Sequence, residues 1–309
     1  MRSSFLRKVA FIFSIFSMSG AARKTVKDFG YGFNENGRLR QLDSKTGELT
    51  DKPFQFIDQS HYEDLGDAIT DYVYELMDQN GLTRHYFPES VPKDKATFIF
   101  STFKEVKDID KLMVIIHGSG VVRAGQWARS LIINDSLNSG TVLPYVKLAQ
   151  SRGYEVIITN TNDNYRDNKA IEGSGSPEKH ADSVWKKFIQ PSNPKKIAIV
   201  AHSYGGVITT HLASKFNDDF TQKVFAVAFT DSVHGSRGID RHLANVGVNF
   251  VTSTAELNKV LSKSERDVER RSAGTTKHEM TSYKCMEKLF EFVDEKEIKF
   301  SGTIKKDEM

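Results

Sequence analysis

The chain has 309 residues, of which 39% are hydrophobic, and this is enough to bury the core of one ordinary α/β domain. Its 43 basic and 40 acidic residues give a formal net charge of +3, which is too small to predict nucleic-acid binding, and no RNA-binding motif accompanies it. A single cysteine, Cys285, excludes an internal disulfide framework and a cysteine-rich zinc site. Neither a cofactor nor direct nucleic-acid contact is therefore expected.

The two ends of the chain resemble targeting signals. Basic residues precede the apolar run Val9–Met18, and small residues follow it, so residues 1–22 are predicted to be a secretory signal peptide. The run is shorter than the roughly 20 apolar residues of a transmembrane helix. An acid-free start with arginine and serine also suits a mitochondrial transit peptide. Lys306–Met309 resembles the endoplasmic-reticulum retrieval tetrapeptide, with methionine in the last place, although a frayed charged tail would have the same composition.

The first third of the chain is assigned no chemistry. Residues 23–60 form a polar extension in which Tyr31–Phe33 and Gly37–Leu39 predict a short hairpin. His61–Gly81 has apolar residues at helical spacing and ends at a glycine, so it is predicted to be a helix. Thr97–Phe103 alternates and is rich in β-formers, which predicts a strand at or near the sheet edge.

A glycine-rich loop follows the next predicted strand. Lys111–Gly120 contains five consecutive apolar residues and then His-Gly-Ser-Gly, as expected for a buried parallel strand that delivers a loop to its carboxyl end. This loop resembles the glycine motif of lipases and esterases, whose backbone N–H groups stabilise an oxyanion. Gly118 and Ser119 are therefore candidate oxyanion-hole residues, while a simple turn before a helix is the alternative.

The middle of the chain continues the alternation of helices and strands. Helices are predicted over Tyr145–Arg152 and Pro177–Ile189, the second with a stripe of core residues. Tyr154–Asn160 is predicted to be a strand, and the Asn-, Asp- and Gly-rich Asn160–Ser176 a loop.

The most informative stretch places one serine at a sharp turn. Ile197–Val200 is a short apolar run typical of a strand buried on both faces, and Ala-His-Ser-Tyr-Gly follows it. A nucleophile elbow has this order, since small neighbours such as Gly205 let the backbone raise the hydroxyl of Ser203 above the sheet. The N-terminus of the helix predicted over Val207–Phe216 would favour negative charge above Ser203. An ordinary strand-to-helix turn is the alternative.

Candidate acids and bases follow at the ends of later elements. Lys223–Val233 is predicted to be a strand that presents Asp231 at its tip, with His234 just beyond it. Glu256, after the strand predicted over Gly247–Ser253, is a rival acid. His278 lies in a predicted loop before the last helix, which is predicted over 283–292.

The chain order Ser203, Asp231, His278 is the nucleophile, acid, histidine order of α/β-hydrolases. The sequence therefore predicts one α/β-hydrolase-like domain over 61–293, with a mostly parallel sheet covered by helices on both faces and a charged tail over 294–309. In the implied mechanism His278 is the general base, Asp231 orients it, and backbone N–H groups of Ser119 and Tyr204 bind the oxyanion. His234 is the rival base, and a surface role for the loop histidine is the alternative.

Several blocks resemble the argonaute-binding-protein-two domain family, which includes animal cotranscriptional regulators formerly called family with sequence similarity 172. The blocks span about Phe29 to Phe292, and they are Leu112–Arg129, Ala201–Gly206, Thr230–His234, and Ser272–Gly274 with His278-Glu279. The resemblance implies an α/β-hydrolase-like fold with Ser203 in the nucleophile position. It also implies links to Argonaute, small-RNA chromatin silencing and splicing. Vertebrate members carry a long lysine-rich insertion with a candidate nuclear-localisation signal, where this chain has only the short loop 164–176.

Two functions of different classes follow. The first is a serine hydrolase of an ester, thioester or amide, acting in the endoplasmic reticulum or secretory pathway. The second is a catalytically silent cotranscriptional regulator or scaffold that binds Argonaute or chromatin proteins, which the family places in the nucleus or cytoplasm. A small acyl or peptide-like substrate belongs to the first, and a protein partner to the second.

Overall fold

The computed structural model describes residues 23–264 and 267–307. The predicted targeting segment 1–22 and the last two residues of the retrieval-like tetrapeptide lie outside the described residues.

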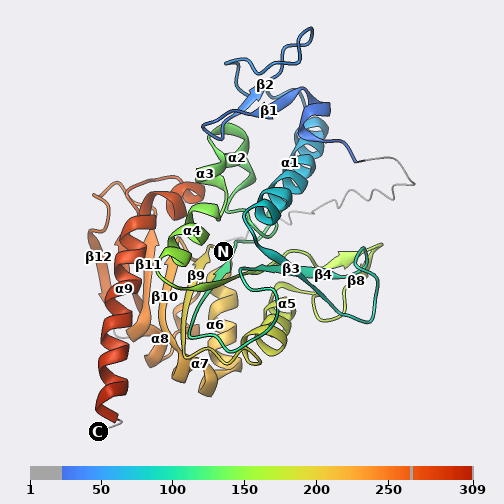
Figure 1. Cartoon of the computed structure of the whole chain (residues 1–309). Coiled ribbons are helices and arrows are strands. Elements are labelled where there is room, and N and C mark those ends of the chain that lie inside the picture. The colour runs from blue at the N-terminus through green and yellow to red at the C-terminus, as the bar shows by residue number, and fades with distance from the viewer. Residues whose placement is uncertain (1–22, 265–266, 308–309) are drawn as a thin grey trace, which may run out of the picture.

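One mixed sheet of nine strands organises the described residues, in the order β12-β13-β11-β10-β9-β5-β6-β4-β3 (Figure 1). The strands from β13 to β6 pair in parallel, whereas β12, β4 and β3 pair antiparallel at the two edges. Continuous apolar runs form the central strands because both of their faces are covered. The strands of this sheet are β3 (Thr83–Phe87), β4 (Thr97–Ser101), β5 (Lys111–Ile116), β6 (Glu155–Ile158), β9 (Lys196–His202), β10 (Val224–Thr230), β11 (Gly247–Val251), β12 (Val260–Ser264) and β13 (Asp267–Ser272).

Helices cover both faces of the sheet, which confirms the predicted α/β architecture. Alternate residues of the central strands divide between two apolar cores, one on each face. The first core is covered by α1 (Gln59–Gln79), α2 (Arg129–Asn134), α3 (Leu137–Gly140), α4 (Leu143–Ser151) and α9 (Thr281–Asp307). The second core is covered by α5 (Pro177–Val184), the π-helical turn Trp185–Ile189, α6 (Gly205–Lys215), α7 (Asn217–Lys223) and α8 (Arg241–Val246).

The N-terminal extension packs on the outside of α1, as Figure 1 shows. It forms the predicted hairpin from β1 (Tyr31–Phe33) and β2 (Leu39–Gln41). The rings of Phe33 and Tyr72 stack with their centroids 4.8 Å apart, which fixes the hairpin to the helix. A second small hairpin, β7 (Tyr165–Arg166) with β8 (Lys169–Ala170), lies within the loop predicted after β6.

Two features differ from the sequence prediction. The strands β3, β12 and β13 were not predicted, because they lie at or near the sheet edges and carry charged residues in place of continuous apolar runs. The last helix, predicted to end at 292, continues to Asp307. Glu297 in this extra length contacts Lys111 at 2.7 Å and Lys196 at 3.3 Å, and Phe300 packs on Phe225 with ring centroids 5.8 Å apart. Ion pairs and one aromatic contact give no apolar periodicity from which a helix could be predicted.

A stability test follows from the packing of Trp185. Its side chain is fully buried, stacks with Phe216 and with Phe220, and donates its indole N–H to Asp219 at 2.9 Å. Trp185→Ala should therefore lower the free energy of unfolding by about 3–5 kcal/mol in urea denaturation. The exposed neighbour provides the control, since Lys186→Ala should change this free energy by less than about 0.5 kcal/mol. A loss below about 1 kcal/mol in the tryptophan variant would contradict this packing.

Candidate functional site

Ser203 lies at a strained turn between β9 and α6. Its φ is +53°, a conformation that costs a residue other than glycine about 1–3 kcal/mol. Backbone bonds hold the turn: Ser203 N donates to Thr230 O at 3.0 Å, and Gly206 N donates to Ser203 O at 3.1 Å. This is the geometry predicted for a nucleophile elbow at the carboxyl end of a central strand.

Three glycines allow the backbone segments around Ser203 to approach closely. A Cβ at Gly205 would lie 2.6 Å from the Ile116 carbonyl oxygen, and one at Gly206 would lie 1.7 Å from Ser232 Oγ. A Cβ at Gly118 would lie 3.1 Å from Ser203 Cβ. The glycine loop after β5 therefore lies against the elbow, as the oxyanion hypothesis requires.

Asn162 holds this glycine loop from the segment after β6. Its Nδ2 donates to Gly118 O at 2.9 Å and to Val122 O at 3.1 Å. His117 Nδ1 also donates to Gly118 O, at 2.8 Å. Ser119, the other candidate oxyanion residue of this loop, is exposed. Sequence reasoning missed Asn162, because nothing in the Asn- and Asp-rich segment marks one amide as the clamp.

Asp231 and His278 meet above the sheet, as their chain order predicts. His278 Nδ1 donates to Asp231 Oδ2 at 2.7 Å, and the N–H of Thr252 donates to Asp231 Oδ1 at 3.0 Å. Asp231 directly follows β10 and has φ +48°, a left-handed conformation that is strained for a residue other than glycine.

The pKa values of the two groups shift in opposite directions. The hydrogen bond to Asp231 raises the pKa of His278, although partial burial opposes this shift. Burial alone would raise the pKa of Asp231, but the bonds from His278 and Thr252 outweigh it, so the pKa is lowered. Both shifts favour the charged pair, and His278 is about half exposed.

A second histidine lies under His278. The ring of His202 is 4.7 Å from the ring of His278, centroid to centroid, and its Nδ1 donates to Thr230 O at 2.9 Å. Burial lowers the pKa of His202 to about 4, and the neighbouring His278 contributes to this shift. His202 is therefore neutral at pH 7, and its ring packs against His278 at a tilt of 37°.

The bond that would complete the relay is missing. Among residues 23–264 and 267–307, no group makes a hydrogen bond with Ser203 Oγ, whereas His278 is bonded to Asp231. The site thus has the acid–histidine half of a relay, an elbow serine and a glycine loop, but no serine–histidine hydrogen bond.

The other candidate residues occupy different surroundings. Glu256 is exposed, and within the described part of the chain its side chain makes no hydrogen bond or ion pair with His278. His234 contacts Ser232 and Asp267 rather than Ser203. The hydroxyl of Tyr204 donates to Glu178 Oε1 at 2.7 Å, which joins the elbow to the start of α5.

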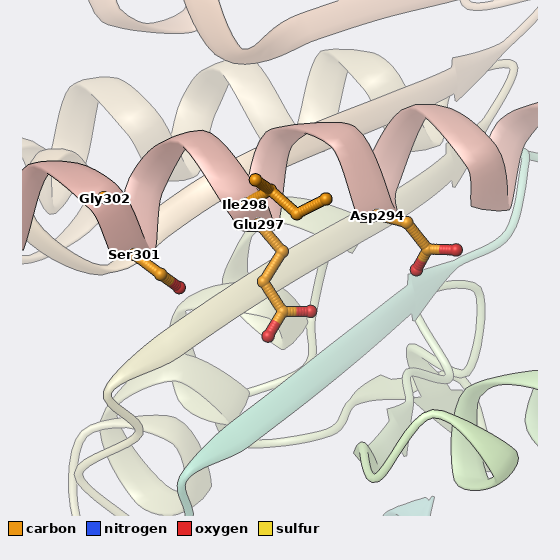
Figure 2. Close-up of a pocket in the computed structure, with 5 residues that line it drawn as sticks. All are labelled: Asp294, Glu297, Ile298, Ser301 and Gly302. Carbon is orange, nitrogen blue, oxygen red and sulfur yellow. The ribbon is translucent and has the colours of Figure 1, made fainter.

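Two hollows in the surface lie away from Ser203. One of about 490 Å³ lies beside α9 at the opposite edge of the sheet, where β5 and β9 begin, and Figure 2 shows Asp294 and Glu297 pointing from α9 toward the strands. The other, of about 370 Å³, lies between the N-terminal extension and the start of α1.

Neither a metal centre nor a membrane-spanning helix is found within the described ranges. Residues 23–264 and 267–307 contain no group of three or more His, Cys, Asp or Glu side chains arranged to hold a metal ion. In the same ranges, every helix is too short or too polar to cross a bilayer.

The charged pair gives a prediction for NMR titration. Asp231→Asn removes the negative partner, so the pKa of His278 should fall toward or below the usual histidine value of about 6.5 when followed through the imidazole Cε1–H signal. Glu279→Gln is the control, because Glu279 is the weakest of the groups that raise this pKa, and its loss should move it less. An unchanged pKa in the asparagine variant would show that the two side chains do not pair in solution.

Comparisons with known proteins agree with one another. Residues 22–257 match the model of the Arb2 domain. The human protein named "Cotranscriptional regulator ARB2A" is 36% identical over 342 residues, which cover 88% of this chain and 80% of that protein. A Caenorhabditis elegans protein named "FAM172 family protein homolog Y75B8A.31" is 39% identical over 276 residues, covering 86% of this chain and 85% of that protein.

A solved structure shares the fold. A histone deacetylase from Saccharomyces cerevisiae superposes with a TM-score of 0.51 at 14% sequence identity, covering 77% of this chain and all of that one. At this identity the likeness concerns the fold alone. The family match and the identity over most of the chain confirm the resemblance found in the sequence, and the chain belongs to the Arb2 domain family.

Proposed function

We propose that this chain is a cotranscriptional regulator that acts by binding partner proteins, with Argonaute or chromatin proteins as the expected partners. Relatives named cotranscriptional regulators align over 88% of the chain, and this is the observation that carries the proposal. The geometry around Ser203 is compatible with a binding role, because Ser203 Oγ has no hydrogen-bond partner among the described residues. Binding through the protein surface does not require that bond.

The proposed role implies a nuclear or cytoplasmic place of action. A chain confined to the reticulum lumen would be separated from Argonaute and chromatin by a membrane. The secretory reading of residues 1–22 remains the competing prediction, and a fusion of the full chain to a fluorescent protein distinguishes the two compartments.

Co-purification tests the binding role. Argonaute should co-purify with the tagged full-length chain, and Ser203→Ala should retain it within about twofold, because the hydroxyl makes no bond that the fold depends on. Lys186→Ala, far from the elbow, serves as the matched surface control. Failure to recover Argonaute with the wild-type chain, or its loss only in the Ser203 variant, would contradict the proposal.

A second candidate function is that of a serine hydrolase, and the 2.7 Å bond between Asp231 and His278 favours it. In this mechanism His278 Nε2 takes the proton of Ser203 as Oγ attacks the carbonyl carbon of an ester, thioester or amide. The Ser119 and Tyr204 N–H groups stabilise the oxyanion beside Gly118. The leaving group then takes the proton from His278, and water releases the acyl group. Substrate binding would have to bring Ser203 Oγ within about 3 Å of His278 Nε2.

A fluorophosphonate probe tests this second function at a defined position. The adduct should map to the tryptic peptide Ile197–Lys215, disappear in Ser203→Ala, and form at least about 100-fold more slowly in His278→Gln, since the general base is lost. Glu256→Gln should label at the wild-type rate. Folded wild-type protein without an adduct on this peptide would exclude the hydrolase.

A further inference from the structure

A complete hydroxyl–imidazole–carboxylate chain lies beside the elbow, in residues that the site above does not use. Ser232 Oγ is 2.6 Å from His234 Nδ1, and His234 Nε2 is 3.3 Å from Asp267 Oδ1. A carboxylate only accepts hydrogen bonds, so Nε2 carries the proton and Nδ1 presents a lone pair. The Ser232 hydroxyl must then donate to Nδ1, which is the direction that general-base activation of a serine requires.

The imidazole of His234 is buried, whereas the two groups that it joins, Ser232 and Asp267, are both partly exposed to solvent. The side chain of His234 is 3% exposed and packs against Phe229 with ring centroids 4.8 Å apart and the rings tilted by 36°, whereas one third of Asp267 is exposed. Ser232 is partly exposed, and the next residue, Val233, is 59% exposed. Burial lowers the pKa of His234, although Asp267 opposes the shift, so the ring is the free base at pH 7.

Neighbouring residues hold Ser232 in place. Its N–H donates to Asn249 Oδ1 at 3.2 Å, and Asn249 Nδ2 donates back to Ser232 O at 3.3 Å. Ser232 Oγ lies so close to Gly206 that any Cβ there would collide with it. Gly206 belongs to the first turn of α6, whose partial positive charge favours a negatively charged oxygen beside it.

We propose that Ser232 is a second reactive serine, a nucleophile toward activated acyl and phosphoryl esters, with His234 as its general base and Asp267 orienting the ring. In the step, Ser232 Oγ bonds to the carbonyl carbon or phosphorus, and His234 Nδ1 takes the hydroxyl proton. The bond to the leaving group breaks, and that group departs with the proton from His234. The hydrogen bonds distinguish the two serines, because Ser203 Oγ lacks the one that Ser232 makes.

A fluorophosphonate adduct on Ser203 can be distinguished from one on Ser232, because trypsin cleavage leaves the two serines on different peptides. A fluorophosphonate should form a Ser232–phosphorus bond and release fluoride, and the adduct should appear on peptide Val224–Arg237. The adduct should persist in Ser203→Ala and disappear in Ser232→Ala. His234→Gln should slow its formation at least about 100-fold, because the base is removed.

Ser236→Ala is the matched control on the same peptide, and it should label at the wild-type rate. Labelling rates are compared only among variants whose unfolding midpoint equals that of the wild-type protein. Asp267→Asn replaces His234→Gln if the glutamine variant fails to fold. Absence of an adduct at Ser232 in folded wild-type protein would overturn the proposal, and so would an adduct whose rate does not depend on His234 or Asp267. Labelling of Ile197–Lys215 alone would support the Ser203 hydrolase and overturn the second site.

Discussion

The close approach of backbone segments at the carboxyl ends of β5, β9 and β10 is the constraint on which the rest of this structure depends. These strands are covered on both faces, so the chain can change direction only beyond their ends. There, glycines at 118, 205 and 206 replace side chains that would collide with neighbouring backbone or serine atoms. The strained φ values of Ser203 and Asp231 are part of the same crowding.

This crowding brings two sets of polar side chains together within a few residues of Asp231. On one side the carboxylate of Asp231 pairs with His278, and on the other Ser232 begins the chain to His234 and Asp267. An elbow built like that of a hydrolase therefore does not by itself define which serine is activated. The hydrogen bonds of this structure favour Ser232, while the elbow geometry favours Ser203.

The sequence predicted the features that come from continuous apolar runs and chain order. The runs that became β5, β9 and β10 mark strands buried on both faces, and the order of Ser203, Asp231 and His278 predicted the pairing of the last two. The contact between His234 and Asp267 joins residues 33 positions apart through an unpredicted strand, so no local pattern marks it. The far half of α9 was missed for a related reason, because its contacts are the ion pairs of Glu297 and the isolated packing of Phe300, which form no apolar period in the sequence.

The acid–histidine pair is assembled in this structure, while the hydroxyl of the elbow serine stays outside it. A crystal structure of the full-length chain tests this most directly, through the distances from His278 to Asp231 and to Ser203. We expect a hydrogen bond near 2.7 Å between His278 Nδ1 and Asp231, and no hydrogen bond between Ser203 Oγ and His278 Nε2. A serine–histidine hydrogen bond of about 3 Å would contradict it and would favour the hydrolase.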